Sequence, residues 1–117
     1  MAIGVIGSSG RTNNYVDYDV TVTAQSGDPA TDNWHADATA GQNAYVQTVL
    51  TGDISSNLYV DAATDFYVIP NPQTITESAL DQFSWISAAE STSTGIKFYS
   101  MSGKPSFDIP VTIRIIK

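Results

Sequence analysis

The sequence contains no cysteine and a single histidine, His35. The missing thiols exclude disulfide frameworks, thiolate zinc sites, iron–sulfur clusters and cysteine nucleophiles. One imidazole excludes a multi-histidine metal site within one chain. At 117 residues the chain is long enough to bury one hydrophobic core. We therefore expect one domain that folds on that core alone, with no cofactor and no metal site.

Basic side chains are also scarce: 5 Lys and Arg face 12 Asp and Glu, for a net charge of −7. A phosphate backbone would be repelled by such a chain, so we expect no nucleic-acid partner. Four of the five basic residues lie within 97–117. Two interpretations of this positive end stay open: contacts between copies of the chain, or lysines that keep edge strands from aggregating.

Long apolar runs are absent too. No stretch approaches the roughly 18–20 residues that span a membrane, so we expect no membrane partner. The first residues, Met-Ala-Ile-Gly-Val-Ile-Gly, lack the basic start and the length of a secretory signal. We expect synthesis in a cytoplasm without a signal peptide.

Residues 1–15 form an arm that is rich in Gly, Ser and Asn. The stretch Gly7-Ser8-Ser9-Gly10 is typical of a flexible joint. Its one apolar cluster consists of Ile3, Val5 and Ile6. We expect these three side chains to attach the protein to a neighbour or to its own domain, which spans residues 16–117.

Segments with the residue pattern of β-strands are frequent in the sequence. Over residues 16–24, Val and Tyr alternate with Asp and Thr, which is typical of a half-solvated antiparallel strand. Further strands are expected at 44–51, 57–60, 66–69, 85–89, 95–100 and 111–116. The fold class is therefore mainly β: a single antiparallel β-sandwich, immunoglobulin-like or otherwise, or a partly open barrel.

One short helix is expected near residues 75–83. Thr74 and Glu77 have the three-residue spacing of a capping box, in which each side chain satisfies the other's backbone N–H. Four apolar residues then fall on one helical face, which we expect to lie on the sheet: Ile75, Ala79, Leu80 and Phe83.

Catalytic and metal-binding patterns are weak. His35 stands two residues before Asp37, but no Gly-x-Ser-x-Gly turn accompanies them, and an exposed loop histidine is the simpler interpretation. Four residues, Asp28, Asp32, Asn33 and Asp37, crowd this loop without the spacing of a calcium loop, so turn formation explains them better. We expect no enzyme.

Aromatic residues offer the better binding candidate. Exposed Trp and Tyr beside Asp and Asn bind sugars by stacking on the ring faces. Trp34 lies in a polar loop, so we expect it to contact a ligand such as a glycan. Trp85, Phe98 and Tyr99 lie in expected strands and are better assigned to the core or to a seam between subunits.

The order of motifs from residue 45 onward resembles a small β-domain of bacteriophage structural proteins of the head-fibre and tail-fibre-like kind. The residues that carry the resemblance are Tyr45-Val46-Gln47-Thr48-Val49, Gly52, Trp85-Ile86-Ser87-Ala88-Ala89-Glu90, Thr94-Gly95-Ile96-Lys97-Phe98-Tyr99, Gly103-Lys104-Pro105 and Asp108-Ile109-Pro110-Val111-Thr112-Ile113. Trp34 matches the Trp that often precedes the Tyr-x-Gln-Thr-Val strand of that family.

The resemblance implies a non-enzymatic virion protein: a capsid decoration, head-fibre or tail-associated subunit. Its expected partners are other capsid or tail proteins and copies of itself, for example in a trimer. The expected location is the virion, with attachment through the arm. The alternative is a carbohydrate-binding module that contacts host surface glycans, which predicts that Trp34 takes part in binding.

Overall fold

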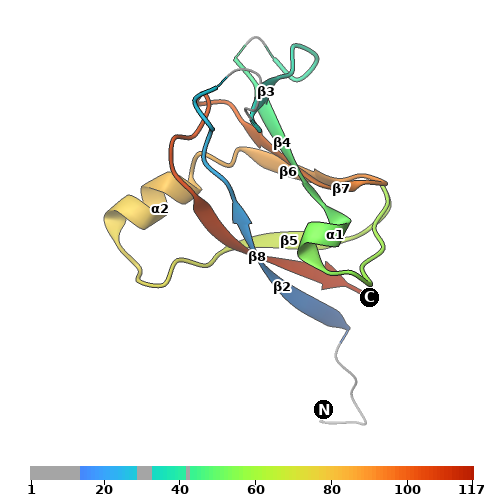
Figure 1. Cartoon of the computed structure of the whole chain (residues 1–117). Helices are drawn as coiled ribbons and strands as arrows, with labels where there is room; N and C mark the ends of the chain where they lie inside the picture. Colours follow the sequence, from blue (N-terminus) through green and yellow to red (C-terminus); the bar gives the residue numbers. More distant parts are fainter. Residues whose placement is uncertain (1–13, 29–32, 42) are drawn as a thin grey trace.

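The computed structural model describes residues 14–28, 33–41 and 43–117. In this part of the chain, seven strands form two antiparallel sheets that pack face to face as a β-sandwich (Figure 1). The mainly β fold expected from the sequence is confirmed. The arm residues Ile3, Val5 and Ile6 lie outside the described residues.

The first sheet has the order β2-β8-β5. β2 (Tyr15–Val22) and β5 (Phe66–Pro70) are its edges, and β8 (Ile109–Ile116) runs antiparallel between them. Alternate residues of β8 are buried, as the period-two pattern predicts for a strand with one face on the core. β8 is therefore the central strand of this sheet, and it contributes more buried side chains to the core than β2 or β5 does.

The second sheet has the order β3-β4-β7-β6. β4 (Tyr45–Leu50) and β7 (Gly95–Ser100) are its inner strands. β3 (His35–Ala36) and β6 (Ala88–Ser91) are short edges. The observed bounds of β7 are those expected from the sequence, whereas β3 falls within a segment expected to be a loop.

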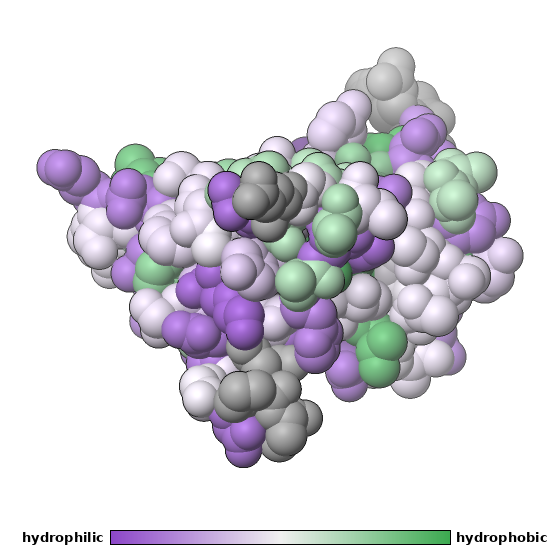
Figure 2. Space-filling view, turned by 90° about the horizontal axis from the view of Figure 1, so that it is seen from above, coloured by the Kyte–Doolittle hydropathy of each residue, from purple (hydrophilic) through white to green (hydrophobic). Residues whose placement is uncertain are grey.

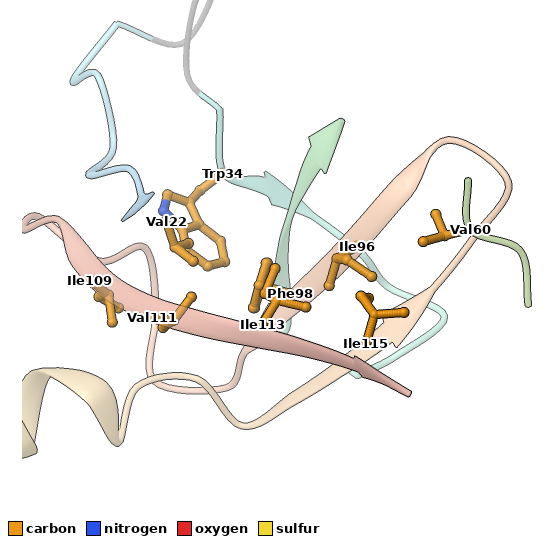
Figure 3. Close-up of a cluster of buried hydrophobic side chains, with 9 residues drawn as sticks. All are labelled: Val22, Trp34, Val60, Ile96, Phe98, Ile109, Val111, Ile113 and Ile115. Carbon is orange, nitrogen blue, oxygen red and sulfur yellow. The ribbon is translucent and has the colours of Figure 1, made fainter. Parts of the chain in front are cut away.

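The core fills the space between the sheets (Figure 3). Its buried apolar side chains come from both layers and from two connecting segments: Val22, Trp34, Val60, Ile96, Phe98, Ile109, Val111, Ile113 and Ile115. Burial of this many apolar side chains is the main source of stability in a domain without disulfides.

Within the described ranges, two helices connect the strands. α1 (Thr51–Ile54) directly follows β4, and α2 (Glu77–Phe83) lies at one side of the sandwich (Figure 1). The expected cap of α2 is wrong. Thr76, not Thr74, has the extended backbone of an N-cap, and its hydroxyl accepts a hydrogen bond from Ala79 N at 3.0 Å.

The expected apolar face of α2 is also only partly realised. Phe83 packs against the core, but Leu80 is exposed, and Ile75 precedes the helix and is exposed as well. The helix therefore touches the sandwich mainly through its last turn. Viewed from above, hydrophobic side chains occur in small groups among hydrophilic ones (Figure 2).

The strand expected at 57–60 is not formed. These residues turn and then run irregularly, yet Val60 is buried and Leu58 packs against the core. The two alternating apolar residues, Leu58 and Val60, hold this connecting segment against the core through their side chains, but its backbone does not pair with a strand.

Candidate functional site

Trp34 is part of the core and is not an exposed ligand contact. Its side chain is 1% exposed, and its indole Nε1 donates a hydrogen bond to Thr23 O at 2.9 Å. Both ring faces are occupied by the protein, so neither can stack on a sugar. The expectation of an exposed Trp34 fails because a polar loop carries this one large apolar side chain inward, where burial is favourable.

Gln47 makes a matching contact from β4. Its Oε1 accepts hydrogen bonds from Thr23 N and Thr23 Oγ1, both at 3.1 Å, and its Nε2 donates to Thr23 O at 2.9 Å. The side-chain amide thus pairs with the Thr23 backbone as a neighbouring strand would. Gln47 is 5% exposed, so these bonds tie the end of β2 to the second sheet in a buried setting.

A polar groove of about 620 Å³ lies beside this contact, between β2 and the β3–β4 pair. His35 lines it together with Asp19 and Asp53. Asp19 accepts a hydrogen bond from Thr112 Oγ1 at 3.0 Å. No serine lines the groove within the described ranges, so these residues do not assemble a Ser–His–Asp arrangement there.

The acidic loop is partly described. Asp37 Oδ1 accepts hydrogen bonds from the backbone N and the hydroxyl of Thr39, which is the turn geometry expected for an Asx residue. Asp32 lies outside the described residues. In the part of the chain that the structure describes, no three His, Asp or Glu side chains gather as a metal site would require.

The outer faces of both sheets carry charge at their centres. Arg114 on β8 holds Asp17 of β2 through two bonds of 2.8 and 3.0 Å, and its guanidinium lies 4.1 Å from the centroid of the Tyr15 ring. Lys97 on β7 pairs with Asp37 at 3.4 Å. These two cations lie on central strands, so the expectation that the basic residues protect edge strands is wrong for them.

These contacts shift the pKa values of two aspartates and one tyrosine. Hydrogen bonds from Arg114 lower the pKa of Asp17, and those from Thr39, followed by Lys97, lower the pKa of Asp37. A hydrogen bond with the Glu90 carboxylate raises the pKa of Tyr99. Arg114 and Lys97 are thus each paired with a carboxylate of the same chain.

The opposite side of the sandwich has a different chemistry. A groove of about 330 Å³ lies where the edge strand β5 meets the segment that leads from α2 into β6. Its lining residues are all uncharged and mostly apolar: Phe66, Tyr67, Val68, Phe83, Ile86, Ala88 and Ala89. We call this the apolar groove.

The backbone of β5 faces this side with unpaired groups. Ile116 N donates to Asp65 O, and Asn71 N donates to Pro110 O. Because hydrogen-bonded pairs alternate along an antiparallel ladder, Tyr67 and Ile69 also face β8. The N–H and C=O groups of Phe66 and Val68 therefore point to the free edge, where no described residue bonds them.

Comparisons with known proteins give no match. The chain is matched by no protein-family model, no curated protein and no solved structure. No helix within the described residues is long and apolar enough to cross a membrane. The site must therefore be interpreted from its own geometry.

Sequence reasoning missed both the Gln47 contact and the apolar groove. Gln47 is one polar residue within a strand pattern, and nothing local indicates that it bonds Thr23. The groove has a partial signal, because the run Phe66-Tyr67-Val68-Ile69-Pro70 has no charged residue and ends in a proline. Such a run indicates an edge strand.

Proposed function

We propose that this protein is a non-enzymatic structural subunit of a bacteriophage particle. The observation that carries the proposal is the uncharged edge strand β5 beside the apolar groove. An unpaired, uncharged strand edge is a template for pairing with another chain, and natural sheets usually guard such an edge with charge. The resemblance of the chain from about residue 45 onward to small β-domains of virion proteins is the reason that we propose a bacteriophage particle as the assembly.

The construction of the domain supports the same role. The two sheets are joined by a continuous core and by the Gln47–Thr23 contact, so they pack as one unit. The cations at the centre of each outer face are paired with carboxylates of the same chain. A domain packed on one core, with the uncharged edge strand β5, is suited to repeating within an assembly.

The alternative function, glycan binding through Trp34, lacks its contact residue because the indole is buried. No other observation on the described surface favours a sugar over a protein partner. Glycan binding is therefore not proposed as a second function.

Electron microscopy of purified particles with gold-labelled antibody against this chain tests the proposal. Regular label on the head or the tail supports a structural role, and its position separates a decoration from a fibre. Unlabelled intact particles, with the protein found only in the soluble lysate, would contradict it.

A further inference from the structure

We propose that residues 2–6 of a neighbouring copy add to β5 as an extra antiparallel or parallel strand, with their side chains in the apolar groove. This inference rests on the proposed function, because it names how copies of the subunit join. It assigns the arm a docking site that the sequence alone left open.

The backbone of β5 is prepared for such a strand. Phe66 and Val68 direct their N–H and C=O groups away from β8, toward the free edge. An incoming extended segment would satisfy these groups through main-chain hydrogen bonds, which is how peptides add to exposed sheet edges. Pairing with an added strand would stop at Pro70, because proline has no backbone N–H to donate.

The uncharged lining of the apolar groove favours an uncharged segment as its occupant. Every residue that lines it is uncharged. Within 1–13, the run Ala2-Ile3-Gly4-Val5-Ile6 is also uncharged and contains no proline. Its five residues equal the length of β5. Ile3 and Val5 share one face of an extended strand, so both would reach the groove together.

The opposite edge of the same sheet is a poorer acceptor. β2 carries Asp17 and Asp19, and the groove beside it is lined by Asp19 and Asp53. An apolar segment docked there would bring carboxylates out of water without pairing them. The chemistry therefore favours β5.

The direction of the chain at β2 favours a neighbour over the same molecule. Lys117 N donates to Asn14 O at 2.6 Å, so the β2–β8 pairing extends as far as Asn14. Asn14 thus lies on the edge of the sheet opposite β5. An arm that paired with the β5 strand of its own chain would have to cross the end of β8, whereas the β5 strand of a neighbouring copy could be brought alongside it.

Two copies can exchange arms reciprocally about a twofold axis, or each copy can place its arm on the next copy in a ring when the rotation between copies permits closure. A symmetric oligomer, with each arm on the next subunit, is the expected product.

Paired single-cysteine variants test the docking directly, because the natural chain has no cysteine. Ile6→Cys in one chain is mixed under oxidising conditions with Tyr67→Cys in another. Tyr67 points away from the core, and Ile6 would point the same way when Ile3 and Val5 lie in the groove. Relative to an added strand, Tyr67 occupies a non-hydrogen-bonded position, where side chains approach closely enough for a disulfide. Thr48→Cys, exposed on the other sheet, is the matched control.

We expect the arm cysteine to form a mixed disulfide dimer with the Tyr67 variant several-fold faster than with the Thr48 variant. Equal rates, or no mixed dimer, would overturn the docking site. If a chain that carries both cysteines closes as a monomer while separate chains do not link, the occupant is the chain's own arm, and exchange is wrong.

Val68→Pro provides a second readout in the full chain, because it removes an N–H that faces the free edge. We expect an unchanged circular dichroism spectrum and a fall in mass to the monomer by light scattering. Retention of the parent's oligomeric mass would contradict strand addition. Both tests use purified protein, so absence from particles would remove the proposed function without affecting this result.

Discussion

Single residues tie the two sheets together at the end of β2. Thr23 O accepts hydrogen bonds from Gln47 Nε2 and Trp34 Nε1, and Thr23 N donates one to Gln47 Oε1; the Gln47 and Trp34 side chains are buried. Each such intramolecular hydrogen bond contributes about 0.5–1.5 kcal/mol to stability, and Gln47 makes three of them. The stability of the sandwich therefore depends on a side chain that contributes little to the apolar core.

Gln47→Leu tests this dependence. The change leaves Thr23 N without its acceptor, so we expect the free energy of unfolding to fall by about 1–3 kcal/mol. Thr48→Ala, at the next and exposed position of β4, should change it by less than about 0.5 kcal/mol. Urea denaturation of the two variants measures both values, and equal losses would contradict the role of Gln47.

The Asp17–Arg114 pair makes stability depend on pH. The pKa of Asp17 in the folded chain is below its ordinary value of 3.8. A carboxyl with a lowered folded pKa stabilises the fold above its unfolded pKa, and this contribution is lost as the pH falls through the folded value. The pair should therefore weaken in the acid range below 3.8.

Thermal melts of the parent and of Asp17→Asn, from about pH 6 to about pH 2, measure this contribution. We expect the parent's advantage in Tm to be largest above about pH 4 and to shrink below it. Asp65→Asn, at an exposed position outside this pair, should keep the difference between neutral and acid pH seen in the parent. An advantage of the parent that grows toward low pH would contradict the assignment.

At the scale of the elements, the approach of β7 to β4 requires a glycine. A Cβ placed on Gly95 would lie 2.0 Å from Val49 O and 2.9 Å from Leu50 Cα, both backbone atoms. The strands could not stay paired at this position with any larger residue. A Cβ on Gly52, in α1, would meet nothing within 4 Å.

Gly95→Ala should therefore destabilise the domain by at least about 1–3 kcal/mol, because backbone has to move. Gly52→Ala should leave it unchanged or stabilise it by up to about 1 kcal/mol, since alanine favours helix over glycine. Chemical denaturation distinguishes the two. A Gly95→Ala protein as stable as the parent would show that the close approach is wrong.

The cap of α2 gives a second paired comparison. Thr76→Ala removes the acceptor of the Ala79 N–H, and we expect a loss of about 0.5–2 kcal/mol in the stability of the helix. Thr74→Ala should cost much less, because α2 begins after Thr76. Hydrogen exchange of the Ala79 amide reports this directly, and faster exchange in the Thr74 variant alone would reverse the assignment.

These elements show what the sequence can and cannot predict. Local alternation identified β2, β7 and β8 because each strand buries one face, and its period appears in the residues themselves. The cap was misplaced because Thr74 and Thr76 both precede the helix, and the capping-box spacing selected the wrong one. Trp34, Gln47 and the groove depend on contacts between distant segments, which no local pattern contains.

At the scale of the whole molecule, the two open sides of the sandwich differ in character. One is polar and carries aspartates, and the other is uncharged, with unpaired backbone groups on β5. On the outer face of each sheet, the central cation (Arg114 or Lys97) forms an ion pair with an aspartate. The uncharged side is therefore the surface that an assembly would cover, and the arm has the composition to cover it.

The copy number of the chain in purified particles tests this account most directly. Ile3→Asp combined with Val5→Asp places charge in the segment proposed to dock, while Ser8→Asp combined with Ser9→Asp adds the same charge in the joint. All three proteins should melt alike. We expect the parent and the joint variant in a constant ratio to the major capsid or tail protein by quantitative mass spectrometry, and the arm variant to be absent. Incorporation of the arm variant at the parent's level, or absence of the parent itself, would contradict the account.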